Sequence, residues 1–162
     1  MEELFSHRLF RIGIGFVALV LGAWAVSKLV RRFAEQEATR GARDVARVLK
    51  KSGATAAARV ALEHGLFVRA AELYEGAGRL ADAGRALRKA EKWERAAQVF
   101  ESAEDYDSSA FCYRKAGDNR SLLRALDKAG NWLEAAQVAE EDGHLSEAAD
   151  FLLRAGKKAE AV

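Results

Sequence analysis

The stretch KAEKWERAAQV (residues 89–99) returns as KAGNWLEAAQV (residues 128–138), thirty-nine residues later in the chain. Steps of thirteen residues explain this distance, because the two stretches lie three steps apart in an unbroken series. The first positions of the steps are Gly65, Gly78, Glu91, Glu104, Gly117, Gly130, Gly143 and Gly156. From about residue 52 onward the chain is therefore an internal repeat with a period of thirteen.

Each repeat carries apolar residues at fixed steps after its first position, which is numbered 0 here. Position 2 is mostly large and apolar, positions 5 and 6 are mostly small, position 9 is mostly large, and position 12 is mostly alanine. This spacing places the side chains on one face of an α-helix of about eleven residues. Over thirteen residues an unbroken helix would rotate that face by about 220° per repeat, so the chain must break between repeats.

Glycine at position 0 suits that break, because it adopts the left-handed conformation that ends a helix. At Glu91 and Glu104 we expect a strained or differently shaped turn that costs up to about 1 kcal/mol each. Only two or three residues separate successive helices, so neighbours must fold back antiparallel. The predicted fold is all-α: an α-solenoid of short antiparallel hairpins over residues 52–162, with thirteen residues per helix and twenty-six per hairpin. The absence of proline and the abundance of alanine and leucine agree with it.

The segments GRLADAGRAL, KWERAAQVFESAEDY and GNWLEAAQVAEEDGHLSEAADFLLRAG resemble tetratricopeptide-type helical repeats. They are most similar to the short, glycine-punctuated repeats in solenoid arms of clathrin, coatomer and intraflagellar-transport proteins. The tetratricopeptide unit has 34 residues and a proline near its end, whereas this chain has a hairpin of twenty-six residues and no proline. Groove residues of that family therefore cannot be transferred position by position. The resemblance implies protein binding or scaffolding rather than catalysis.

A charge-free stretch, IGIGFVALVLGAWAVS, lies between Arg11 and Lys28. With its apolar flanks it extends from Leu9 to Val30, about 33 Å of helix, which is enough to cross a hydrocarbon core of about 30 Å if Arg11 and Lys28 reach toward the headgroups. We predict a short tail over residues 1–8 and a single transmembrane helix over residues 9–30. Ala18 and Gly22 are four residues apart, as are Ala23 and Ser27, a spacing of small residues that lets two membrane helices pack closely. The alternative is that small residues are simply common in membrane helices.

The orientation follows from the positive residues, because cytoplasmic flanks carry the excess of lysine and arginine. Six such residues lie on the C-terminal side of the apolar stretch: Lys28, Arg31, Arg32, Arg40, Arg43 and Arg47. The prediction is an N-terminus outside and repeats in the cytoplasm. The alternative is a signal peptide cleaved near Ala25, since Ala23-Trp24-Ala25 has the small-x-small form of a cleavage site.

Residues 31–51 read as a basic juxtamembrane helix with a weak apolar stripe of Ala38, Ala42, Val45 and Leu49. The span from residue 28 to residue 51 carries a net charge of +5, whereas residues 52–162 carry −3. The six cations after the span either contact anionic lipid headgroups or only satisfy the topology rule. The mildly acidic repeats argue against binding to nucleic acid.

No set of residues in the sequence predicts chemistry. His7, His64 and His144 lie in separate segments without companion ligands at metal-binding spacing, so we expect neither a metal site nor a cofactor. Cys112 is the only cysteine, which excludes an intramolecular disulfide and favours a reducing compartment. Ser108 and Ser109 lack a nearby histidine, and no catalytic residues are assigned. The sequence predicts a protein that is not an enzyme.

Two places interrupt the repeat and are candidate protein-binding positions. Phe111 stands at position 7, where the other repeats carry polar residues, so we expect its ring to face solvent. Arg85 and Arg124, at the same position of other repeats, are further candidates. Asn119 replaces the large residue at position 2 in GDNRSLLRALDKA, where Leu122-Leu123 replace the small pair, so this repeat is either a bend or compensated packing. The last repeat stops at Val162 without a polar cap, so we expect either a longer chain or a covered edge.

These observations give two function hypotheses. The first is a membrane-anchored scaffold or adaptor that binds partner proteins at the cytoplasmic membrane surface. The alternative is a structural component that assembles with itself into a coat, ring or filament. Self-assembly without other proteins would separate the second from the first.

Overall fold

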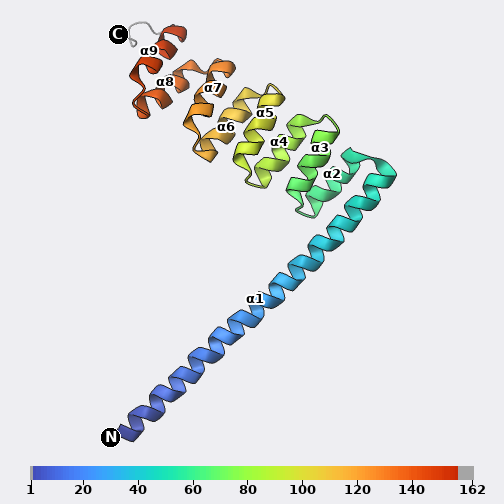
Figure 1. Ribbon diagram of the computed structural model, residues 1–162, viewed down its shortest axis with the longest axis vertical. Coiled ribbons are helices and arrows are strands. Elements are labelled where there is room, and N and C mark those ends of the chain that lie inside the picture. Colours follow the sequence, from blue (N-terminus) through green and yellow to red (C-terminus); the bar gives the residue numbers. More distant parts are fainter. Residues whose placement is uncertain (1, 157–162) are drawn as a thin grey trace. The chain divides into compact units, whose positions relative to one another are not determined.

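The computed structural model describes the backbone from Glu2 to Gly156, and the side chains of Trp24 and of residues 26–156. Within these residues the chain forms nine helices: α1 (Glu2–Ser52), α2 (Ala54–Glu63), α3 (Phe67–Gly76), α4 (Leu80–Lys89), α5 (Trp93–Ser102), α6 (Tyr106–Ala116), α7 (Asn119–Ala129), α8 (Trp132–Glu141) and α9 (Leu145–Arg154). The helices from α2 onward pack in consecutive antiparallel pairs (Figure 1). The all-α prediction and its thirteen-residue spacing of helices are confirmed.

Two compact units make up the chain, residues 1–43 and residues 44–162. Helix α1 continues without interruption through the predicted span and the predicted juxtamembrane helix. Its last turns belong to the second unit, where Val45 is buried and Leu49 packs against the core. Ala38 and Ala42 are exposed, so only the second half of the predicted stripe is buried.

Among the described residues, no helix is long and apolar enough to cross a membrane. Most of the predicted span, Leu9–Val30, lies outside the residues whose side chains are described. The predicted packing residues Ala18, Gly22 and Ala23 also lie outside them, and Ser27 is exposed. The transmembrane helix stays a prediction.

Every turn between α2 and α9 has the same backbone hydrogen bonds. After α3, the Arg79 N–H donates to the Tyr74 carbonyl at 2.9 Å and the Gly78 N–H donates to the Glu75 carbonyl at 3.0 Å. This pair of bonds is the Schellman motif, which satisfies the last carbonyls of a helix. Arg79, whose N–H makes the first of these bonds, is also the N-cap of α4. Each connection is therefore short and forces the chain to reverse.

Glu91 and Glu104 occupy the left-handed position in two of these turns, with φ of 55° and 58°. Both keep the Schellman bonds that the glycine turns have. A side chain at positive φ costs about 1 kcal/mol relative to glycine. The expectation of strain therefore holds, whereas the expectation of a different turn shape is wrong.

Replacing Glu104 with glycine is expected to raise the free energy of unfolding by up to about 1 kcal/mol, because glycine relieves the left-handed strain. Urea denaturation followed by circular dichroism measures the change. The control is Glu140→Gly, which places glycine inside α8 and should lower stability by up to about 1 kcal/mol. Shifts of the same sign in both variants would contradict the assignment of strain to Glu104.

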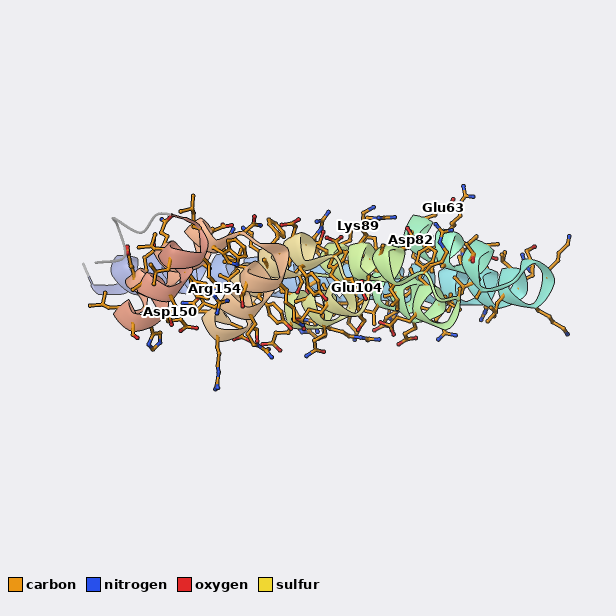
Figure 2. All side chains as sticks on the ribbon, turned by 90° about the horizontal axis from the view of Figure 1, so that it is seen from above. Glu63, Asp82, Lys89, Glu104, Asp150 and Arg154 are labelled. Atoms are coloured by element: carbon orange, nitrogen blue, oxygen red, sulfur yellow. The ribbon has the colours of Figure 1, made fainter. Side chains whose placement is uncertain are left out.

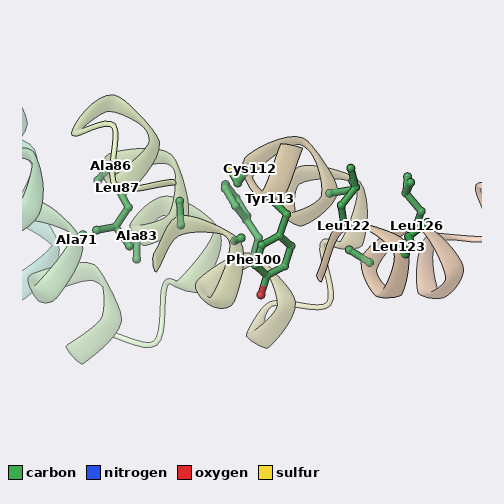
Figure 3. Close-up of a cluster of buried hydrophobic side chains, with 14 of the residues drawn as sticks. Ala71, Ala83, Ala86, Leu87, Phe100, Cys112, Tyr113, Leu122, Leu123 and Leu126 are labelled. Carbon is green, nitrogen blue, oxygen red and sulfur yellow. The ribbon is translucent and has the colours of Figure 1, made fainter. Parts of the chain in front are cut away.

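The core is a row of side chains from the inner faces of the helices (Figure 3). Position 9 is buried in every repeat, including Phe100 at 1% exposure and Leu126 at 1%. Position 8 is mostly buried as well, and the sequence reading missed it: Leu73, Ala86, Cys112, Ala125 and Phe151 are core residues. Position 2 is only half-buried or exposed. The alanines at position 12 are also half-buried or exposed: four are C-caps, and Ala116 and Ala129 are the last residues of α6 and α7.

Large and small residues compensate along this core. Gly84, at position 6, leaves space that the Phe100 ring fills, because a Cβ at Gly84 would lie 2.7 Å from that ring. Sixteen residues separate the two positions, and the same offset pairs Leu123 with Ala139, where the large and small members are exchanged. Helices α7 and α8 contact each other less extensively than other consecutive pairs from α2 to α9. In the GDNRSLLRALDKA repeat Leu122 and Leu123 are thus buried and the contact after it is looser, and both the bend and the compensated packing stay predictions.

Two helices have side-chain N-caps. Asp105 and Asp118 each accept a hydrogen bond of 3.1 Å from the backbone N–H three residues later, on Ser108 and Ser121. Contacts with the Ser121 hydroxyl and backbone N–H hold the pKa of Asp118 below its ordinary value of 3.8. The charged form of Asp118 is therefore favoured in the folded chain.

Replacing Asp118 with alanine is expected to lower the free energy of unfolding by about 1 kcal/mol at pH 7. Because the folded-state pKa is lowered, the charge-dependent contribution is present above about pH 4 and is lost as the pH falls through the folded value. The difference between the variant and the unmodified chain should shrink between pH 5 and pH 2 in urea denaturation. Asp150→Ala, which removes an exposed aspartate that caps no helix, is the control. A constant difference across this pH range would contradict the assignment.

Candidate partner-binding surface

Phe111 lies on α6 with 41% of its surface exposed. Its ring meets the half-buried Trp93 edge to face, with ring centroids 6.4 Å apart and an interplanar angle of 70°. Two cations lie over the same ring, Arg88 at 5.7 Å and Lys115 at 5.9 Å from its centroid. The prediction that Phe111 faces solvent is confirmed, and the structure adds three neighbours to it.

Beside this cluster is an open groove of about 370 Å³, which we call the Trp93 groove. Its walls come from the start of α5 and the end of α6: Glu91, Lys92, Trp93, Glu94, Arg95, Lys115 and Ala116. The antiparallel packing brings these two helix ends to the same edge of the repeat unit. Trp93 is the one aromatic residue in this lining, and we call the five charged residues the rim of the groove.

The rim is unevenly neutralised. Arg95 pairs with Glu75 of α3 at 3.1 Å. Arg88, Lys92 and Lys115 are exposed and form no ion pair with any described residue. The groove residues, Arg88 and Glu75 together contain four cations and three carboxylates, a net charge of +1 within a repeat domain of net charge −3.

Behind Phe111 the helix is packed with neutral groups. Burial raises the pKa of the Cys112 thiol above 9.0, and the Arg88 charge only partly offsets the rise. Burial and the nearby Glu101 carboxylate also raise the pKa of Tyr113, whose hydroxyl donates to Glu101 at 3.1 Å. Both groups are protonated at neutral pH, so they support the surface without adding charge to it.

A second groove lies three repeats further on, between the start of α8 and the end of α9, with a volume of about 410 Å³. We call it the Trp132 groove; it is lined by Gly130, Asn131, Trp132, Leu133, Glu134 and Ala155. Three repeats are an odd number of reversals, so this groove lies on the opposite edge of the unit from the Trp93 groove. The similarity of the two eleven-residue stretches therefore does not place them on one surface.

The chemistry of the two grooves differs at equivalent positions. Asp127 stands where the first groove has Arg88, and Asp150 stands where it has Phe111. Asp127 accepts from the Trp132 indole N–H at 3.1 Å and pairs with Arg154, the equivalent of Lys115, at 2.7 Å. With the ion-pair partners Glu75 and Arg114 counted, the charged residues around the Trp93 groove sum to +1 and their equivalents around the Trp132 groove sum to 0.

The other predicted protein-binding residues are not part of the Trp93 groove. Arg85 is exposed on α4 and pairs with Asp82. Arg124 on α7 donates to the Ser121 hydroxyl at 2.9 Å, and Asn119 donates to Asp142 at 2.8 Å. No hydrogen bond, ion pair or aromatic contact among the described residues joins these three to Phe111.

Sequence reasoning missed Arg88, Trp93 and Lys115 as neighbours of Phe111. Lys115 follows Phe111 by four residues and so shares its helix face, which the sequence alone indicates. Arg88 and Trp93 lie on other helices, and only the antiparallel packing brings them there.

The predicted lipid-contacting residues all lie on α1. Lys28, Arg31, Arg32, Arg40, Arg43 and Arg47 are exposed along this helix. The Lys28 ammonium lies 4.9 Å from the Trp24 ring centroid, and Arg47 pairs with Asp44 at 3.2 Å. Charged side chains also project outward along the row of repeat helices, Lys89 and Asp150 among them (Figure 2).

No group of three or more potential metal ligands lies together within the described part of the chain. The Ser109 hydroxyl is buried and has no hydrogen-bond partner there, at a position where other repeats carry alanine.

No protein-family model, curated protein or solved structure matches the chain. Inferences about its function therefore rest on the repeat architecture and on the surface just described.

Proposed function

We propose that the chain is a membrane-anchored helical-repeat adaptor that binds partner proteins at the cytoplasmic membrane surface. The observation that carries the binding role is the Trp93 groove together with Phe111 beside it, because an exposed aromatic residue and cations without ion-pair partners interrupt a regular repeat surface there. Aromatic and arginine side chains of this kind are the usual energetic centres of protein interfaces. A catalytic role is no part of the proposal.

The anchor is supported by the apolar segment from Leu9 to Val30 and by the exposed cations that follow it. Cytoplasmic flanks of membrane spans carry such an excess of positive charge. The same cations can contact anionic headgroups, each worth about 1 kcal/mol near the surface. The tetratricopeptide-like character of the repeats, with hairpins of twenty-six residues, supports binding or scaffolding as their role.

Self-assembly into a membrane-associated structure is the second candidate. The observation that favours it is a set of exposed leucines on α8 and α9: Leu133 at 50%, Leu145 at 69% and Leu153 at 46%. Leu133 and Leu153 stand at positions that are mostly polar in the other repeats. Exposed apolar groups of this kind mark interaction sites when they are contiguous.

Crosslinking of the full chain in its native membrane, followed by mass spectrometry, tests the proposal. The control is a variant that lacks residues 52–162. Proteins other than the chain itself, crosslinked only when the repeats are present, are the expected result. Crosslinks between copies of the chain alone would overturn the adaptor and favour self-assembly. Recovery of the full chain in the soluble fraction would overturn the anchor.

A further inference from the structure

We propose that the Trp93 groove binds an acidic segment of a partner protein, with an apolar side chain against Trp93 and Phe111 and carboxylates paired with Arg88 and Lys115. This inference rests on the proposed adaptor function and names the chemistry of the partner. The aromatic pair supplies the apolar contact, since both rings reach the surface at one edge of the unit.

Charge complementarity selects the occupant. The cations over the Phe111 ring have no carboxylate partner among the described residues, and the groove with Arg88 carries +1 once the Arg95–Glu75 pair is counted as neutral. Bringing carboxylates to such a rim speeds encounter and disfavours neutral or basic segments. Glu91 and Glu94 on the same rim further disfavour uniformly anionic surfaces and favour a segment with a few carboxylates around an apolar residue.

The Trp132 groove shows what the chain does at an equivalent site without this chemistry. There Asp127 pairs with Arg154 and also accepts a hydrogen bond from the Trp132 indole N–H. The cation and the indole at that site therefore both have partners within the chain. In the Trp93 groove Arg88 replaces the aspartate, and its charge adds to that of Lys115 over Phe111. The open cations are therefore a local difference between the grooves and do not follow from the repeat itself.

The test variant converts the first groove into the second. Arg88→Asp with Phe111→Asp gives the Trp93 groove the residues of Asp127 and Asp150, which the fold already accommodates at equivalent positions. Phe111→Asp alone is the second variant, in case the double variant fails to fold by circular dichroism. Lys128→Glu is the matched control. Lys128 has the same helical position as Lys115 and lies 5.1 Å from the Tyr106 ring centroid on the opposite edge.

The probe is a random twelve-residue peptide library displayed on phage and selected against the full chain in detergent micelles. Selected peptides should be enriched in aspartate and glutamate around an apolar residue. In fluorescence anisotropy with one labelled selected peptide, the double variant should bind at least about tenfold more weakly, because it loses both charge and aromatic contacts. Lys128→Glu should bind within about twofold of the unmodified chain.

Three results would overturn the inference: selected peptides without acidic enrichment, equal binding by the double variant, or binding to phosphatidylserine vesicles that the double variant abolishes. The last would make this face a membrane contact. Native-membrane crosslinking of the double variant separates the two proposals. Partners that crosslink only when residues 52–162 are present, and that still crosslink to the double variant, would support the adaptor function but contradict this binding site. No partners on the unmodified chain would remove the adaptor itself.

Discussion

Replacing Leu126 with alanine is expected to lower the free energy of unfolding by about 3 kcal/mol. Leu126 is the position-9 residue of α7 and has 1% of its surface exposed within the core. The substitution removes its buried contacts and leaves a cavity that rigid neighbouring helices fill only partly. Urea denaturation followed by circular dichroism gives the change in free energy.

The control for this prediction is Leu133→Ala. Leu133 is the same residue type in the next helix but has 50% of its surface exposed, so its loss should change stability by no more than about 0.5 kcal/mol. Extensive contacts within the repeat unit join consecutive helices only, so the damage should also stay local. Hydrogen exchange in Leu126→Ala should rise first in α6, α7 and α8. Equal effects of the two substitutions, or a uniform rise in exchange, would contradict this account.

Replacing Gly84 with alanine is expected to lower the free energy of unfolding by about 2 kcal/mol, although alanine is the better helix former by about 1 kcal/mol. The new methyl group would lie 2.7 Å from the Phe100 ring. That ring is 1% exposed and cannot move into solvent, so helices α4 and α5 must separate or the ring must leave its preferred rotamer. Urea denaturation again measures the loss.

A second substitution tests the cause. Gly84→Ala combined with Phe100→Leu recreates the pair that Ala71 and Leu87 form at the equivalent positions one repeat earlier. The double variant should therefore be more stable than Gly84→Ala alone. Gly76→Ala is the control, because a Cβ there meets no atom within 4 Å and should stabilise the helix by up to about 1 kcal/mol. A double variant less stable than Gly84→Ala would show that the ring is not the obstacle.

Much of the fold followed from local rules. The position of every helix from α3 to α9 could be predicted, because glycine at a fixed interval and apolar residues at helical spacing act within a single repeat. Glu91 and Glu104 show the limit of this reasoning. The packing of the helices on either side holds both residues in the turn that glycine adopts elsewhere, at positive φ.

The candidate site was predictable only in part. The break in pattern at Phe111 could be seen by aligning the repeats, since position 7 is polar in the others. Its neighbours could not, because Arg88 lies twenty-three residues earlier on another helix. The same alignment of repeats made Arg85, Arg124 and Asn119 candidates for protein binding. In the structure each of them contacts a residue away from the Trp93 groove.

By itself the sequence determined the period, the helices and their reversals, because each depends on residues a few positions apart. It also determined that the two tryptophan stretches occupy equivalent positions of the repeat. Only the tertiary structure decided that Asp127 pairs with Arg154 beside one groove, and that Arg88 and Lys115 lie over the Phe111 ring beside the other. The physical reason is that ion pairs and aromatic contacts require side chains from different helices to meet, and antiparallel packing alone brings them together.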